Sequence, residues 1–149
     1  MKVGVLMGSA SDSEKMAKAS ETLERFGIEA DVRVLSAHRN PHQVVELVST
    51  ARENGYVAFI CGAGMAAHLA GVVAAHTTLP VVGVPMSGGA LNGVDALYST
   101  VQMPKGIPVA TVAVDGAMNA ALLAVQMMAV DDETLTQKLL EHRAEMVPR

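Results

Sequence analysis

Three short segments of the chain combine polar side chains that could do chemistry, and each directly follows a run of apolar residues. The first segment is Gly8-Ser9-Ala10-Ser11-Asp12. Its backbone amides, its two serine hydroxyls and the N-terminus of a following helix could together bind a phosphate group. Asp12 suits ribose hydroxyls or an amino group better, because a carboxylate repels phosphate. Ser11 and Glu14 also have the spacing of a capping box, which needs no ligand.

The second segment is Ser36-Ala37-His38-Arg39-Asn40-Pro41, in which a histidine and an arginine are adjacent. Histidine changes its charge near neutral pH, and arginine is a permanent cation that can hold a phosphate through two parallel hydrogen bonds. Two exposed polar side chains in an ordinary loop would explain the same pattern. The position of the segment after a strand, facing the serine segment across one crevice, favours catalysis.

The third segment, residues 62–71, contains Gly-x-Gly-x-x-Ala, a weak match to the dinucleotide-binding fingerprint. It follows the third predicted strand rather than the first, and the next strand ends without an acidic residue for a ribose. We therefore interpret the glycines as allowing the backbone to approach a small ligand closely. His68 is either a buried structural histidine or a ligand contact. A further loop, residues 102–106, could close over a ligand or be a plain turn.

The elements that must position these segments alternate between strands and helices. Apolar, β-branched runs predict five buried strands, at residues 3–7, 30–35, 57–61, 80–84 and 109–114. Patterns with helical spacing follow each strand, and the last two cover residues 118–130 and 132–146. This order predicts a three-layer α/β fold with a central parallel sheet, flavodoxin-like winding and an extra C-terminal helix. Residues 1–149 are expected to form one domain, with ligands bound where the strands end.

Composition excludes several classes of function. The chain has 149 residues, a formal net charge of −4 and only four aromatic residues of the Tyr and Phe types, with no Trp. A nucleic-acid partner is therefore not expected, because basic surface and aromatic stacking are both lacking. No apolar run approaches the roughly 18 residues of a membrane helix, and residues 1–7 are too short for a signal peptide. We expect a soluble, cytoplasmic protein with no membrane partner.

Metal and disulfide chemistry are not expected either. Cys61 is the one cysteine, so it can form neither an internal disulfide nor a cysteine-rich zinc site. We interpret it as a buried residue at a strand end. The remaining histidines, His42, His76 and His142, lack metal-type spacing with any carboxylate or with the cysteine.

The last two helices carry more apolar surface than one domain needs. The helix at 118–130 is apolar on nearly every side, and the helix at 132–146 has a largely apolar side formed by Leu135, Leu139, Leu140 and Met146. Four earlier helices can already cover both faces of the sheet. We therefore expect the C-terminal helix to lie in contacts between subunits, with packing on its own domain as the alternative.

Taken together, the segments resemble the signatures of a known family, the N5-carboxyaminoimidazole ribonucleotide mutases. Four motifs, in the family's order and with its separations, carry the resemblance: Gly8-Ser9-x-Ser11-Asp12, Ser36-Ala37-His38-Arg39, Gly62-Ala63-Gly64-x-Ala66-Ala67-His68-Leu69 and Val101-Gln102-Met103-Pro104. The family commonly has glycine where this chain has Met65, and proline where it has Ala70. Arg39 and the run of residues 66–68 favour the mutase branch over a second branch that uses free carbon dioxide.

The resemblance implies an isomerase of de novo purine biosynthesis, on the route to inosine monophosphate. The family converts N5-carboxyaminoimidazole ribonucleotide to 4-carboxy-5-aminoimidazole ribonucleotide, by releasing carbon dioxide from a nitrogen and rejoining it to carbon 4 of the imidazole. One group must then give a proton to the nitrogen and take one from the carbon. His38 is the candidate, because a histidine can do both near neutral pH. Neither a cofactor nor a metal is implied.

The resemblance also assigns substrate-binding residues and an assembly. The expected contacts are Arg39, Ser9 and the amides near Ser11 for the phosphate, Asp12 for the ribose, His68 for a carboxylate and carbon dioxide pocket, and Ser36. The family assembles as an octamer with active sites at subunit contacts, so a homo-octamer is expected. Functional coupling to an ATP-dependent carboxyaminoimidazole synthetase, which would feed the substrate, is left open by the sequence.

Two other classes of protein could share this fold. A flavodoxin-like electron carrier would need aromatic rings to sandwich a flavin, and the four aromatic residues lie outside the three segments. A nucleotide-sensing regulatory domain would bind phosphate through the same loops, but it would have no use for His38. Catalytic turnover distinguishes the enzyme from both.

Overall fold

The five predicted strands pair in parallel into one sheet, in the order β2-β1-β3-β4-β5. They are β1 (Lys2–Met7), β2 (Glu29–Val34), β3 (Tyr56–Gly64), β4 (Val81–Met86) and β5 (Ala110–Thr111). The structure, a computed structural model, describes residues 1–147. This strand order is the flavodoxin-like one, in which the chain reverses its direction of winding at β1 and β3 and leaves a crevice at their carboxyl ends. The predicted fold class is confirmed.

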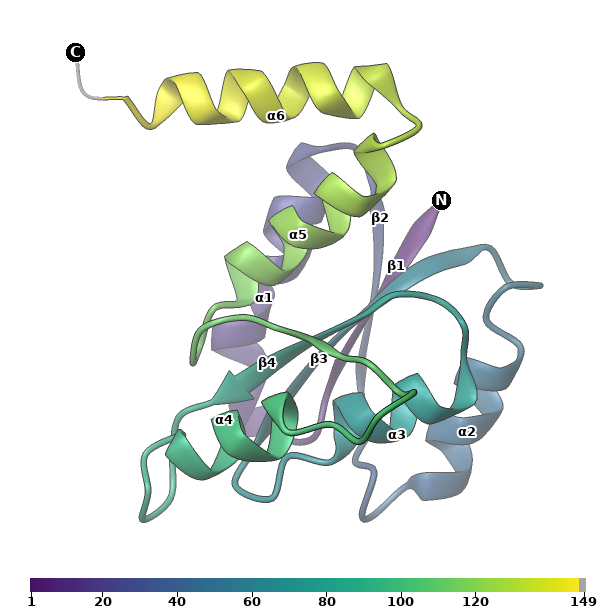
Figure 1. The fold of residues 1–149 in the computed structure, drawn as a ribbon, viewed down its shortest axis with the longest axis vertical. Helices are drawn as coiled ribbons and strands as arrows, with labels where there is room; N and C mark the ends of the chain where they lie inside the picture. The colour runs from purple at the N-terminus through teal and green to yellow at the C-terminus, as the bar shows by residue number, and fades with distance from the viewer. Residues whose placement is uncertain (148–149) are drawn as a thin grey trace.

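Helices cover both faces of the sheet (Figure 1). Two of them, α1 (Ser13–Arg25) and α5 (Ala117–Ala129), pack on one face, and α2 (Pro41–Ser49), α3 (Leu69–His76) and α4 (Val94–Val101) pack on the other. The sixth, α6 (Glu133–Glu145), lies across the end of the first layer. None of the helices within residues 1–147 is both long enough and apolar enough to cross a membrane.

A glycine in β3 brings α1 close to the sheet. A Cβ atom added at Gly62 would lie 2.5 Å from the Sδ atom of Met16, a distance at which one of the two must move. Because glycine has no Cβ, the buried Met16 can pack directly over the strand. The N-terminus of α1 is thereby held beside the carboxyl ends of β1 and β3.

Two predicted strands differ from the observed ones by more than one residue in length. β3 continues to Gly64, three residues beyond the prediction, because residues 62–64 pair with residues 84–86 of β4. β5 is shorter than predicted, since only Ala110 and Thr111 pair with β4. The chain before β5 lines a separate cavity of about 680 Å³, formed with the ends of α2 and α3. The loop at 102–106 is not among the residues that line the crevice at the carboxyl ends of the strands.

The C-terminal helix is divided between its own domain and solvent. Leu135 is only 4% exposed, and Leu139 packs against the same core, so both belong to the domain. The Nζ atom of Lys138 connects α6 to the end of α1, because it donates a hydrogen bond to the carbonyl oxygen of Phe26 at 2.9 Å. Leu140, by contrast, is 57% exposed. Packing on its own domain therefore explains part of the apolar side, and only the remainder is available to another subunit.

Candidate active site

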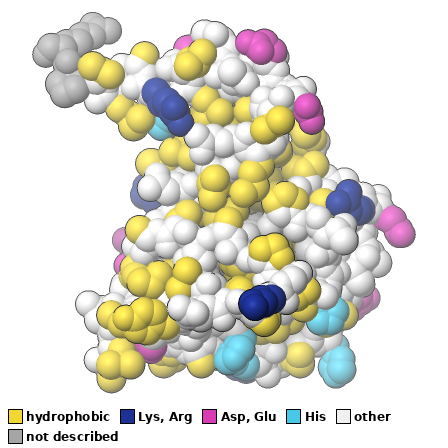
Figure 2. Space-filling view, viewed as in Figure 1, with side chains coloured by type: hydrophobic (Ala, Val, Ile, Leu, Met, Phe, Trp, Pro, Cys, Tyr) yellow, Lys and Arg dark blue, Asp and Glu magenta, His cyan; other side chains and the backbone are white. Residues whose placement is uncertain are grey.

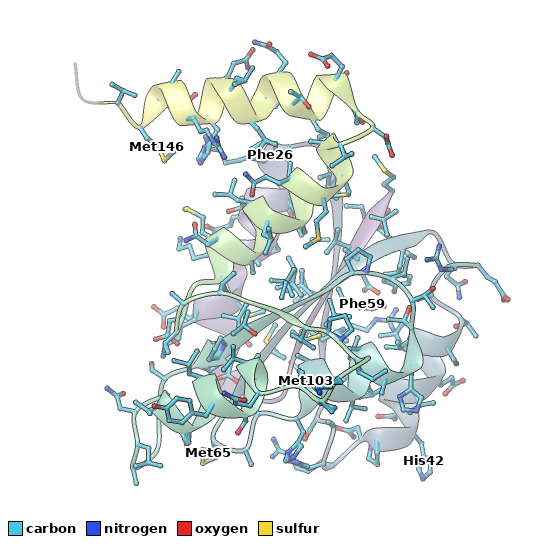
Figure 3. The ribbon with its side chains drawn as sticks, in the orientation of Figure 1. Phe26, His42, Phe59, Met65, Met103 and Met146 are labelled. Carbon is cyan, nitrogen blue, oxygen red and sulfur yellow. The ribbon has the colours of Figure 1, made fainter. Side chains whose placement is uncertain are left out.

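The three segments singled out in the sequence meet in one crevice of about 570 Å³. All seven predicted site residues line it: Ser9, Ser11, Asp12, Ser36, His38, Arg39 and His68. Figure 3, drawn in the orientation of Figure 1, labels Met65 at this edge, beyond the arrowhead of β4, and Phe26 toward the opposite end of the molecule. One wall of the crevice, Ser87-Gly88-Gly89, comes from the loop after β4 and was not predicted.

Two histidines from different loops face each other in the crevice. The Nε2 atom of His38 lies 2.8 Å from the Nδ1 atom of His68, and the rings meet edge to face with centroids 4.8 Å apart. The Nδ1 atom of His68 is also 2.9 Å from the carbonyl oxygen of Ala66, which can only accept a hydrogen bond. A hydrogen on Nδ1 of His68 satisfies both contacts, and we assign this tautomer from the network. Nε2 of His38 is then the acceptor, with its lone pair directed at the Nδ1 hydrogen of His68.

Arg39 connects two of the loops. Its Nη2 atom donates to the carbonyl oxygen of Gly8 at 2.8 Å, and its backbone N–H donates to the hydroxyl of Ser36 at 3.2 Å. Ser36 is buried, and its backbone N–H donates to the side chain of Asn40. Among the described residues, no other guanidinium nitrogen of Arg39 has an acceptor. The guanidinium is thus held over the end of β1 with donors free for an anion.

The first segment forms a 3-10 turn, Ala10–Asp12, that leads directly into α1. Ser9 caps this turn: its hydroxyl oxygen accepts from the backbone N–H of Ser11 at 3.3 Å and from the hydroxyl of Ser11 at 2.8 Å. The predicted capping box of Ser11 with Glu14 is therefore wrong, because the cap lies one turn earlier. Ser9 and Ser11, whose side chains are hydroxyls, line the crevice at the N-terminus of the turn, which is an arrangement suited to an anion.

Asp12 carries a carboxylate at the end of this turn and lines the crevice. Burial raises the pKa of the Asp12 carboxyl above its ordinary value, the nearby Lys15 ammonium lowers it, and the Asp115 carboxylate raises it. The net shift is upward. A carboxylate that is costly to ionise in the empty crevice gains when a ligand supplies hydrogen-bond donors, as ribose hydroxyls do.

Met65 stands at the rim of the crevice in a backbone conformation that L-residues rarely adopt. Its φ is +51°, and its side chain is 62% exposed. The Cγ atom of Met65 lies 3.3 Å from the position that a Cβ on Gly89 would occupy. Met65 therefore reaches across from the glycine segment to the wall formed after β4. Strained residues of this kind are held by the structure around them and are concentrated at functional sites.

The wall at Ser87 was missed because its anchor comes from elsewhere in the chain. The backbone N–H of Ser87 donates to Oδ1 of Asp115 at 2.8 Å, and its hydroxyl donates to Oδ2. The rule that ligands bind at the carboxyl ends of strands would have pointed to Ser87. Nothing in the sequence indicated that Asp115 would reach it.

The remaining predictions concern groups outside the crevice. Cys61 is buried in β3, and burial raises the pKa of its thiol, which fits a structural residue and not a nucleophile. No group of three or more His, Cys, Asp and Glu side chains that could hold a metal occurs within residues 1–147. No Tyr or Phe is among the residues that line the crevice, which argues against a sandwiched flavin there.

Comparison with protein families gives a match over almost the whole chain. The family model described as AIR carboxylase matches residues 2–148. The N5-carboxyaminoimidazole ribonucleotide mutase of Vibrio vulnificus is 53% identical over 147 residues, which cover 97% of this chain and 91% of that protein. The protein of the same name from Pyrococcus abyssi is 50% identical over 145 residues, which cover 97% of this chain and 83% of that protein.

Two further similarities concern architecture. The crystal structure of Treponema denticola PurE superposes with a TM-score of 0.85 at 31% identity, covering 96% of this chain and 91% of that one. The phosphoribosylaminoimidazole carboxylase of Saccharomyces cerevisiae is 50% identical over 137 residues, which cover 92% of this chain but only 24% of that protein. In yeast the matching region is thus joined to about three times its own length of other sequence.

Proposed function

Since this chain belongs to the AIR carboxylase family, we propose that its crevice binds N5-carboxyaminoimidazole ribonucleotide and isomerises it to 4-carboxy-5-aminoimidazole ribonucleotide in purine biosynthesis. Support comes from relatives named as this mutase, which are about half identical over nearly the whole chain. The observation that carries the mechanism is the 2.8 Å contact of His38 with His68 inside the crevice. It places a proton donor and acceptor where three loops converge.

The reaction requires one proton to move twice. In the first half, the bond between the exocyclic nitrogen and the carboxylate carbon breaks, carbon dioxide leaves, and protonated His38 gives the nitrogen its proton. In the second half, carbon 4 of the ring attacks carbon dioxide, and His38 takes the proton that carbon 4 loses. Atoms and charge balance over the two steps, and His38 ends as it began. One histidine suffices, because the acid of the first half is the base of the second.

His68 is proposed to orient the imidazole ring of His38 and to shape the pocket for the carboxylate and carbon dioxide. Its Nδ1 hydrogen is shared between the carbonyl oxygen of Ala66 and Nε2 of His38. A small rotation of the His68 ring directs this hydrogen towards one acceptor or the other. When His38 is protonated, the carbonyl oxygen of Ala66 still satisfies His68. Protonation of His38 therefore leaves the Nδ1 hydrogen of His68 paired with Ala66, while the new hydrogen on Nε2 of His38 is available to the substrate nitrogen.

The phosphate is proposed to bind between Arg39 and the turn that Ser9 caps. Both face the same crevice, and Arg39 is already fastened to the first of these loops through Gly8. A guanidinium, two hydroxyls and the N-terminal end of the turn together match the charge and geometry of a phosphate monoester. Asp12 is proposed to accept from the ribose hydroxyls, and Ser36 to donate its hydroxyl hydrogen to the ligand while shaping the loop.

The expected homo-octamer is supported by apolar surface that one chain leaves exposed. Figure 2 shows hydrophobic side chains gathered over α4. On α4 they form a stripe at intervals of four and three residues, the spacing of one helix face: Val94, Tyr98 and Val101. Leu91, just before the helix, is exposed as well. Leu140 and Met146 add a second exposed group on and after α6. Surface of this kind is characteristic of contacts between subunits.

Location and coupling complete the proposal. We place the enzyme in the cytoplasm, which fractionation of cells would test. Coupling to an ATP-dependent carboxyaminoimidazole synthetase is supported by the yeast relative, in which this domain is joined to a longer chain. Co-purification with such a synthetase is the corresponding test.

The function is tested by following the ultraviolet absorbance of 4-carboxy-5-aminoimidazole ribonucleotide as it forms from the N5-carboxy isomer in the absence of ATP. We expect conversion by the wild-type protein. A well-folded protein that binds the product nucleotide but converts no substrate would instead be the nucleotide sensor. A purified protein that is yellow with bound flavin would support the electron carrier.

A further inference from the structure

Two charged residues that do not line the crevice hold its Ser87-Gly88-Gly89 wall through hydrogen bonds to Ser87. Asp115, in the loop between β5 and α5, accepts from both the backbone N–H and the hydroxyl of Ser87. Lys15, in the first turn of α1, forms an ion pair with Asp115 at 3.0 Å. Its ammonium also donates to the hydroxyl and carbonyl oxygens of Ser87. Ser87 is thus held by two elements that are far apart in the sequence.

The two residues after Ser87 have little rigidity of their own. Gly88 has φ +145° and Gly89 has φ +66°, conformations that glycine adopts readily because it has no Cβ. Within residues 1–147, no hydrogen bond uses the backbone N–H of either glycine. Both glycines line the crevice, and their N–H groups are available to a ligand. Their position depends on where Ser87 is held.

The ion pair contributes little as a stabilising contact. The side chains of Lys15 and Asp115 are 40% and 33% exposed, and pairs that are open to solvent add little to the free energy of unfolding. The geometry is more specific than stability alone would require, since both oxygens of Asp115 and the ammonium of Lys15 converge on one serine. This points to a role in arranging the wall.

Asp12 is a third charged group in the same cluster. It lies three residues before Lys15 in the chain, and it lines the crevice. The Lys15 ammonium lowers the pKa of Asp12, whereas the Asp115 carboxylate raises it. Lys15 therefore offsets two carboxylates, one inside the crevice and one behind its wall.

We propose that Lys15 and Asp115 are positioning residues of the active site, which fix the Ser87-Gly88-Gly89 wall for substrate binding and set the charge balance around Asp12. For the identity of the ligand and for the role of Asp12, this inference rests on the proposed function. Neither side chain lines the crevice, so both act through Ser87 and Asp12 and not by contact with the substrate.

The first test is a double-mutant cycle read out as affinity. Calorimetric titration with 4-carboxy-5-aminoimidazole ribonucleotide would compare wild type, Lys15→Met, Asp115→Asn and the double variant. Asparagine is the suitable replacement, because Asp115 has φ +59° and asparagine tolerates that conformation. We expect each single variant to bind about tenfold more weakly, and the double variant no more weakly than either single one. Additive losses, or no loss, would overturn the proposal.

The second test is the pH dependence of the same affinity, in which the two variants should move in opposite directions. Removing the Lys15 ammonium raises the pKa of Asp12, so the loss of affinity on acidification begins at higher pH. Removing the Asp115 charge lowers the pKa of Asp12, so the loss begins at lower pH. His38, Arg39 and His68 line the crevice from other loops and, like the ligand phosphate, are the same in every variant. Shifts in one common direction, or no shift, would contradict the assignment.

Controls separate this inference from the proposed function. Lys18→Met removes an exposed ion pair with Glu21 on the same helix and should leave affinity and pH dependence unchanged. A loss of affinity in Lys18→Met as large as that in Lys15→Met would assign the effect to net charge and overturn the inference. Wild-type protein that neither binds nor turns over the nucleotide contradicts the proposed function itself. Wild-type binding and turnover, with Lys15→Met and Asp115→Asn unaltered, contradict the positioning role alone.

Discussion

The Nε2 atom of His38 and the Nδ1 atom of His68 lie 2.8 Å apart, although the two residues come from loops after different strands. A contact this short needs one hydrogen and one lone pair. The carbonyl oxygen of Ala66, also beside His68, assigns the hydrogen to His68 and the lone pair to His38. His38 therefore presents a base in the empty crevice, and its partner can turn away when His38 takes up a proton.

Replacement of His68 tests the partnership directly. His68→Leu removes the Nδ1 hydrogen, so we expect kcat to fall about tenfold to hundredfold, less than for loss of the acid or base itself. His68→Asn is the matched variant, because its amide lies about where Nδ1 lies and can still donate to His38. It should recover much of the activity. Steady-state kinetics on both variants decide, and a fully active His68→Leu would mean that the contact has no role in the reaction.

Phosphate binding is expected to depend on Arg39 and Ser9. Arg39→Leu removes the guanidinium and should weaken nucleotide binding by about 1.5–3 kcal/mol, as loss of a charge-assisted contact does. Ser9→Ala removes the cap of the first turn and should weaken binding less. Both changes should affect affinity more than kcat. Titration with the product nucleotide provides the measurement, and unchanged affinity in Arg39→Leu would place the phosphate elsewhere.

Asp12 is expected to reduce stability while it aids binding. Its pKa is raised in the folded chain, so ionised Asp12 disfavours folding at neutral pH, and this cost disappears as the pH falls towards the ordinary value of 3.8. Asp12→Asn should therefore be slightly more stable at pH 7, by about 0.5 kcal/mol or less for a partly exposed site, and should bind the nucleotide more weakly. Thermal unfolding at pH 7 and near pH 4 checks the sign. A variant less stable than wild type at pH 7 would contradict it.

The sequence located the site because parallel strands end at one edge of a sheet. Apolar runs predicted all five strands, and the polar residues after the first three strands do line one crevice. Details that depend on contacts with distant segments of the same chain were not predictable. The glycines at the end of β3 were interpreted as a loop, but they pair with β4. The helix α3 begins only at Leu69, after the backbone turns at Met65.

Long-range contacts account for the remaining differences. Leu135 and Leu139 were expected at a subunit contact, but α1 and α5 form a core that both side chains enter. The ion pair of Lys15 with Asp115 joins α1 to the loop before α5. No local pattern encodes either contact, because each depends on how distant helices settle on the sheet.

Assembly should depend on the stripe on α4. Tyr98 is 61% exposed, and Val94 lies one turn before it. Val94→Asp with Tyr98→Asp introduces charge into the stripe and should give smaller species without unfolding the chain. Ser99→Asp places the same charge on the same helix beside the stripe and serves as the control. Light scattering measures the mass, and a native protein that is an active monomer at micromolar concentration would contradict the octamer.

The catalytic role of His38 is tested most directly by His38→Asn, with turnover and nucleotide affinity measured on the same preparation. If His38 carries the proton in both halves of the reaction, kcat falls by a factor of about 10²–10⁴ or more, while the dissociation constant of the product nucleotide stays close to that of wild type. Retention of more than about a tenth of the wild-type turnover would contradict this role, because removing a general acid–base group costs far more than that.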